Sequence, residues 1–251
     1  MESGWTVTKS VVFSCVVSLF IFALQSCCFS DNSPPAEVAK AAENGLAPLL
    51  DMIPQQKIAH FGFLNADEMA QAGLGNPLQV YVLRADSILG YKKGDELNNL
   101  LEPTDTWLFP VTCHGEAKCS LTVAFFKGKW RAVGIGGSEI AREIDQIKRR
   151  WPRSKGLNPV FIRVFAARAA FIALSGAGAE PALIPFRSGA RAMSAGKKRA
   201  EAHISYTLPE VIPKLVSAVQ RTSQISFPPE ADPPVAEKFG SVRERLFRPE
   251  R

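Results

Sequence analysis

The chain has 251 residues, which is long enough for one large domain with a substantial core. Its apolar content of 46% is that of an ordinary globular protein and excludes a largely disordered chain. The net charge of +6 favours anionic partners such as phospholipid, lipopolysaccharide or acidic polymers. Without an interleaved pattern of aromatic and basic residues, no nucleic-acid partner is predicted.

The first 26 residues are predicted to be a targeting segment rather than part of the fold. Lys9 precedes an apolar run over 11–24, which has the length of a signal-peptide core and is short for a membrane span. The run ends in Leu24-Gln25-Ser26-Cys27, and here the chain resembles bacterial lipoprotein precursors. The resemblance covers this segment alone. It implies cleavage before Cys27 and diacylglycerol on its sulfur; an ordinary secretory signal cut nearby is the alternative.

The same resemblance implies a place in the bacterial cell envelope. Cys28, rather than Asp, would follow the lipid, which points to the outer membrane, facing the periplasm. Residues 27–36 are then a lipidated, Pro-containing tether. A single domain is predicted over 37–222, and a Pro-rich, charged tail over 223–251.

The domain is expected to begin with a helix over 37–53, broken or split at Gly45 and Pro48. Asn65 to Glu68 have the pattern of a capping box at the start of a short helix. Alternating apolar residues over 78–83 predict a strand, and a single helical turn is expected from Leu97.

Residues 106–139 carry the clearest pattern in the chain. Three apolar runs, 107–112, 120–126 and 130–135, are separated by turn signals and predict an antiparallel meander. Pro110 cannot donate a hydrogen bond to a neighbouring strand, so the first strand is predicted to lie at an edge or to be bulged there.

Cys113 and Cys119 flank the first turn of this meander. We predict a disulfide that closes the hairpin, and an exporting signal favours it. The alternative is a metal site formed with His114, but three ligands so close together fit zinc poorly. We therefore predict no metal and no cofactor.

Gly134-Ile135-Gly136-Gly137 lies between the third strand and a strongly amphipathic helix over 138–151. A phosphate-binding loop is one interpretation, but its spacing is not G-x-G-x-x-G and it has no following lysine. A tight turn with Ser138 as the N-cap is the favoured interpretation.

The remaining elements are strands over 160–165, 171–174 and 182–186, and a last helix with a buried face around 211–219. Between them lies a basic stretch that either binds an anion or is a surface loop. Its basic residues are Arg187, Arg191, Lys197, Lys198 and Arg199.

Together these elements predict an α+β fold, a mainly antiparallel sheet with flanking helices. The function that fits best is a membrane-anchored envelope lipoprotein whose domain binds a protein or an envelope polymer without catalysis. An envelope hydrolase that uses His60, His114 or His203 is the alternative, although no G-x-S-x-G or H-E-x-x-H motif occurs. A third hypothesis is an assembly protein whose basic loops and tail contact the membrane.

Overall fold

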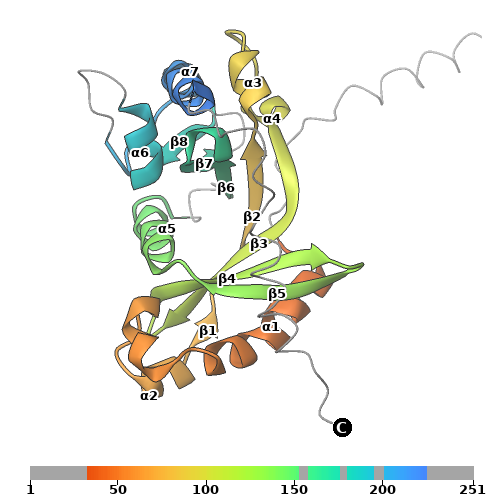
Figure 1. Ribbon diagram of the computed structural model, residues 1–251, viewed down its shortest axis with the longest axis vertical. Coiled ribbons are helices and arrows are strands. Elements are labelled where there is room, and N and C mark those ends of the chain that lie inside the picture. The colour runs from red at the N-terminus through yellow and green to blue at the C-terminus, as the bar shows by residue number, and fades with distance from the viewer. Residues whose placement is uncertain (1–32, 153–157, 176–179, 195–200, 225–251) are drawn as a thin grey trace, which may run out of the picture.

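The computed structural model describes residues 33–152, 158–175, 180–194 and 201–224 (Figure 1). It confirms the α+β fold with a mainly antiparallel sheet flanked by helices. Within these residues, eight strands form one sheet in the order β5-β4-β3-β2-β6-β7-β8, and β1 also pairs with β3. The β2–β6 pairing is parallel, and the other pairings are antiparallel.

The strands are β1 Gly73–Leu74, β2 Leu78–Leu83, β3 Leu101–Cys113, β4 Glu116–Phe126, β5 Lys129–Gly136, β6 Asn158–Val164, β7 Ala169–Ser175 and β8 Ala182–Pro185. The α-helices are α1 Ala36–Asp51, α2 Ala66–Ala70, α3 Ala85–Leu89, α4 Leu97–Leu100, α5 Ser138–Arg150, α6 Arg187–Met193 and α7 Leu208–Gln224. Two 3₁₀ turns are η1 Gln55–Phe61 and η3 Phe165–Ala167.

The long strand β3 joins the two halves of the sheet. One part pairs with β2 and the other with β4, so the prediction that this strand lies at an edge is wrong. The carbonyl of Pro110 accepts a hydrogen bond from the Gly75 N–H at 2.7 Å. The Pro110 nitrogen therefore faces the gap between β1 and β2. The described part of the chain has no strand partner there, so the missing N–H of proline breaks no ladder hydrogen bond. The bulge in the pairing of β3 with β4 lies one residue after Pro110, between Val111 and Thr112.

Both hairpins of the meander turn through two residues with positive φ, the pattern of type I′ turns. The first turn consists of His114 (φ 50°) and Gly115 (φ 78°). The second consists of Lys127 (φ 49°) and Gly128 (φ 77°). These turns match the right-handed twist of the strands, so β3, β4 and β5 form a continuous antiparallel unit.

Helices cover both faces of the sheet, because side chains on a strand point alternately to either side. On β3, Phe109 belongs to a core under α1, whereas the adjacent Leu108 belongs to a core under α5. On β6, Ile162 belongs to a core under α7, whereas Phe161 lies under α5. Helix α5 therefore lies on the face opposite α1 in one half of the sheet and opposite α7 in the other.

Helix α1 runs without a break through Gly45 and Pro48, so the predicted split is wrong. Gly45 instead allows the helix to approach β5 closely. A Cβ atom on Gly45 would lie 2.1 Å from the Cβ of Ala132. The glycine is therefore a packing requirement and not a helix terminator.

Asn65 caps α2 as predicted, since its side chain accepts a hydrogen bond from the Glu68 N–H at 2.8 Å. Glu68 does not complete the capping box. Its carboxylate accepts from the Leu64 N–H and forms an ion pair with Lys118 Nζ at 2.7 Å. This pair is largely buried and fastens α2 to β4.

The predicted signal segment, Cys27 and most of the predicted tail lie outside the described residues. Across the parts of the chain that are described, every helix is too short or too polar to cross a membrane.

Candidate anion-binding site

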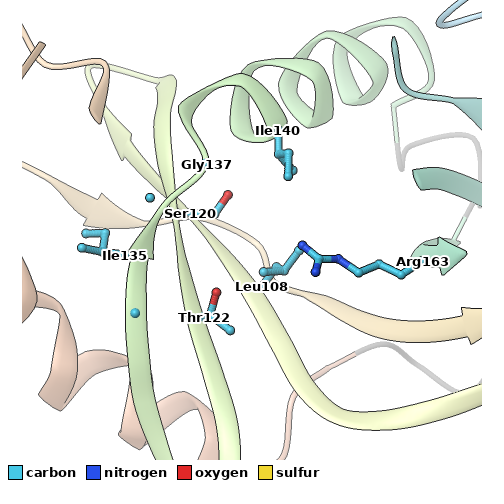
Figure 2. Close-up of a pocket in the computed structure, with 9 residues that line it drawn as sticks. Leu108, Ser120, Thr122, Ile135, Gly137, Ile140 and Arg163 are labelled. Atoms are coloured by element: carbon cyan, nitrogen blue, oxygen red, sulfur yellow. The ribbon is translucent and has the colours of Figure 1, made fainter. Parts of the chain in front are cut away.

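A small pocket of about 240 Å³ lies where the end of β5 turns into α5 (Figure 2). We call it the α5 pocket. Strands β3, β4, β5 and β6 and the first turn of α5 all contribute to its wall. Its lining residues are Leu108, Ser120, Thr122, Gly134, Ile135, Gly136, Gly137, Ile140 and Arg163.

Ser120 supplies a buried hydroxyl to the α5 pocket. It lies on β4 opposite Pro110, on the face that α5 partly covers, and is 5% exposed. Its Oγ has no hydrogen-bond partner among the described residues. Buried hydroxyls in proteins are nearly always paired, so an unpaired one that faces a pocket indicates a missing partner. Figure 2 shows the hydroxyls of Ser120 and Thr122 pointing to the same side of β4.

The N-terminus of α5 supplies unpaired N–H groups at the same place. Gly137, in the left-handed conformation at φ 65°, is the N-cap, and Ser138 is the first helical residue, so the predicted cap was one residue late. No side chain caps this end. The first intrahelical bond runs from the Ala141 N–H to the Gly137 carbonyl. The preceding N–H groups and the positive end of the helix dipole therefore attract an anion.

Arg163 is the charged residue of the pocket lining. It extends from β6 towards Leu108 and the β4 hydroxyls (Figure 2). Its guanidinium lies near the rings of Phe161 and Phe165, at 5.8 and 5.9 Å from their centroids. Among the described residues, no carboxylate forms an ion pair with it. The acidic residue of the first helical turn, Glu139, is exposed and does not line the pocket.

Arg131, on the same face of the sheet, has a buried side-chain nitrogen without a described partner. Arg131 pairs with Ala124, two residues from Thr122 on β4, so its side chain leaves the sheet on the side of the pocket. Its Nε has no hydrogen-bond partner in the described part of the chain. The region around the pocket thus holds positive charge that described acidic groups do not neutralise.

These groups are suited to binding an anion and not to proton transfer. The lining offers hydroxyls, helix N–H groups and a guanidinium, which are the donors that carboxylates and phosphates accept from. It contains no His, Cys, Asp, Glu or Lys that could act as a general base. The volume is below that of typical drug-sized pockets, so it suits a single anionic group.

The basic stretch predicted to bind an anion is only partly described. Arg187 and Arg191 lie one turn apart on α6 and are exposed. The described part of this stretch is a short helix, whereas a surface loop was the alternative to anion binding. Lys197, Lys198 and Arg199 lie outside the described residues, so binding at this stretch stays a prediction.

The two cysteines are free thiols in the structure, both buried in the core under α1. The turn between their strands has two residues, and Cys113 faces Glu116 while Cys119 faces Val111. The cysteines are therefore diagonal neighbours and do not face each other. Cys113 Sγ donates to the Glu68 carbonyl at 3.3 Å, and burial raises the pKa of Cys119 to about 12. The disulfide stays a prediction.

The three histidines lie on different elements. His60 is exposed in η1, because the apolar residues around it pack without it. His114 occupies a hairpin turn. His203 Nε2 lies 2.9 Å from Glu143 Oε2, and this carboxylate also accepts from the Arg187 N–H. No described group of three or more His, Cys, Asp and Glu side chains could hold a metal.

The sequence contained only one signal for the α5 pocket, the Gly-rich turn at 134–137. Ser120 and Arg163 were not predicted as site residues. Neither the pattern of β4 nor that of β6 distinguishes a pocket residue from an ordinary strand residue. Comparisons with protein-family models, with curated proteins and with solved structures found no match.

Proposed function

We propose that this chain is a lipid-anchored protein of the bacterial envelope whose domain binds, without catalysis, an anionic group of an envelope ligand in the α5 pocket. The observation that carries the proposal is the buried, unpartnered Ser120 hydroxyl beside an uncapped helix N-terminus and Arg163. A carboxylate or phosphate is an acceptor for all three donors at once.

The anchor part of the proposal rests on the lipobox Leu24 to Cys27. Envelope polymers offer the required ligand chemistry, since they carry carboxylates and phosphates at high density. A pocket that accepts one such group is suited to a chain end or to a single side group of a polymer or protein.

The histidine-based hydrolase is less well supported. Of the three histidines, His203 has a carboxylate partner that would orient its ring, as catalytic histidines require. No serine or cysteine is hydrogen-bonded to that ring among the described residues. Because His203 does not line the α5 pocket, we expect its substitution to leave the proposed binding unchanged.

The test is a thermal unfolding titration with inorganic phosphate and with acetate at constant ionic strength. The protein is the chain from Cys27 onward with Cys27→Ser, which keeps every described residue. A ligand that binds only the folded state raises the unfolding temperature as its concentration exceeds Kd. We expect saturable stabilisation by at least one of the two anions.

Three variants locate the effect. Gly134→Val fills the pocket, because a Cβ on Gly134 meets no atom within 4 Å. Arg163→Gln removes the charge, and Arg221→Gln is the matched control on the exposed surface of α7. The first two variants are expected to lose the stabilisation and the third to keep it. Equal stabilisation of all four proteins, or of none, contradicts a site in this pocket.

A further inference from the structure

The tip of the β4–β5 hairpin presents the exposed aromatic side chain of Phe125. Figure 1 shows this hairpin extending beyond the rest of the sheet. Phe125 is 47% exposed, and its ring packs edge-on against Trp130 with centroids 5.5 Å apart. An exposed aromatic ring at a projecting tip is available for contact with a partner.

Basic side chains lie at the same tip. Lys127 in the turn and Lys129 after it are exposed, and Lys127 Nζ lies 5.5 Å from the centroid of the Phe126 ring. The acidic residue next to this end of the sheet is Asp105 on β3, which is also exposed. The sequence over 125–131, Phe-Phe-Lys-Gly-Lys-Trp-Arg, is thus an aromatic and basic cluster that sequence analysis overlooked.

The hairpin has the properties of a segment that enters the interface of a membrane. The ladder between its two strands runs up to Phe126 and Lys129, so the backbone groups that face across the hairpin stay paired on contact with lipid. Tryptophan favours the headgroup region, and lysines close to an anionic surface are attracted to it.

The predicted anchor leads to the same face of the sheet. Phe125 and Trp130 are on the face that α1 covers, since Trp130 packs against the core under α1. The predicted tether enters α1 at Ala36. A chain held by lipid at Cys27 would therefore meet the membrane with this face nearby.

We propose that the β4–β5 hairpin tip binds the interface of a membrane that contains anionic phospholipid. The contact holds the anchored domain in a fixed orientation at the membrane and leaves the α5 pocket, on the opposite face of β4, free for its ligand. The proposal uses the lipid anchor of the proposed function only for this orientation. Binding by the hairpin itself does not depend on the anchor or on the pocket.

The experiment measures binding of the unlipidated Cys27→Ser chain to vesicles of phosphatidylcholine with and without phosphatidylglycerol, at low and high salt. Lys127→Asn with Lys129→Gln is the test variant, and Asn suits the positive φ of residue 127. Lys92→Asn with Lys93→Gln is the matched control, two adjacent exposed lysines after α3. Phe125→Ser tests the apolar contact.

We expect salt-sensitive binding to the anionic vesicles. The hairpin double variant should bind about 30-fold more weakly, at about 1 kcal/mol for each lysine near the surface. Phe125→Ser should bind several-fold more weakly, and the control should match the wild type. The proposal is overturned if the protein shows no preference for anionic vesicles, or if the control variant loses binding equally. Binding to a single-stranded oligonucleotide through the hairpin, without vesicle binding, would replace the membrane by nucleic acid and also overturn it.

Discussion

Ser120 is the residue at which folding and binding are in conflict. A buried polar atom without a partner destabilises a protein by about 1–3 kcal/mol, yet Ser120 occupies an otherwise apolar strand position. Alanine at this position would fit the same space and leave no unpaired group. We infer that the hydroxyl is retained for the ligand that satisfies it.

Ser120→Ala is therefore expected to raise the free energy of unfolding by about 1 kcal/mol and to weaken anion binding. Denaturant unfolding measures the first effect, and the phosphate and acetate titrations measure the second. If the variant is less stable than the wild type, the hydroxyl has a structural partner. The argument for a ligand at Ser120 then fails.

Glu68 makes a pH-dependent contribution to stability. The hydrogen bond and ion pair with Lys118 hold the pKa of Glu68 below its usual 4.5, and the Leu64 N–H adds to this. A carboxyl group with a lowered pKa stabilises the folded state above its unfolded pKa. That contribution is lost as the pH falls through the folded value. We expect the wild type to lose this contribution as the pH falls from about 4.5, the ordinary glutamate value, through the lower pKa of folded Glu68.

The Glu68→Gln variant tests this assignment, because glutamine cannot titrate. At neutral pH it should be less stable than the wild type, and the difference should shrink towards pH 3, as measured by denaturant unfolding at each pH. A difference that stays constant across this range would show that Glu68 does not contribute through its charge.

At the level of elements, the contact between α1 and β5 depends on a missing side chain. Gly45→Ala would place a methyl group 2.1 Å from the Ala132 Cβ and should cost about 1–3 kcal/mol of stability. With Ala132→Gly as well, the nearest atom is the Ala132 Cα at 3.5 Å, an ordinary contact. The double variant should recover at least about 1 kcal/mol relative to the sum of the single variants. Additive effects in this cycle would show that the helix does not approach β5 at Gly45.

Element by element, the sequence was most informative where the pattern is local. The period-two alternation over 78–83 predicted β2 with its observed bounds, and the turn signals between the runs 120–126 and 130–135 predicted the second hairpin. The α1 split was predicted wrongly, because Gly45 has the same local signature whether it ends a helix or lets one approach a strand.

The α5 pocket could not be derived in the same way. It forms because the parallel pairing of β2 with β6 brings Arg163 to the face of the sheet that carries Ser120 and Thr122. Arg163 is more than 40 positions from either β4 residue in the sequence. Nothing in the local patterns of these strands predicts the pairing of β2 with β6. The Gly-rich turn was noticed, but the residues that give it a binding character depend on tertiary contacts.

For the whole molecule, the two proposals place membrane contact and ligand binding on opposite faces of the sheet. The face under α1 carries the hairpin aromatic residues and lies next to the predicted tether, and the opposite face holds the α5 pocket. The sheet is thereby placed between the membrane contact and the ligand.

The anchor itself is tested by metabolic labelling with palmitate in a bacterial host. We expect label on the wild type, none on Cys27→Ser, and label retained on Cys28→Ser, the neighbouring control. Label lost with Cys28 instead would move the processing site by one residue. The predicted Cys113–Cys119 disulfide is tested separately by the intact mass of the denatured wild-type protein. A disulfide would lower this mass by two hydrogens.

The most direct test of the α5 pocket is an NMR titration that follows backbone amide resonances as phosphate or acetate is added at constant ionic strength. Binding at the helix N-terminus predicts saturable shifts at the amides of Gly136, Gly137, Ser138 and Glu139, and the loss of these shifts in Gly134→Val. Shifts that never saturate, or that concentrate around Arg187 and Arg191 on α6 instead, would contradict an anion site at the start of α5.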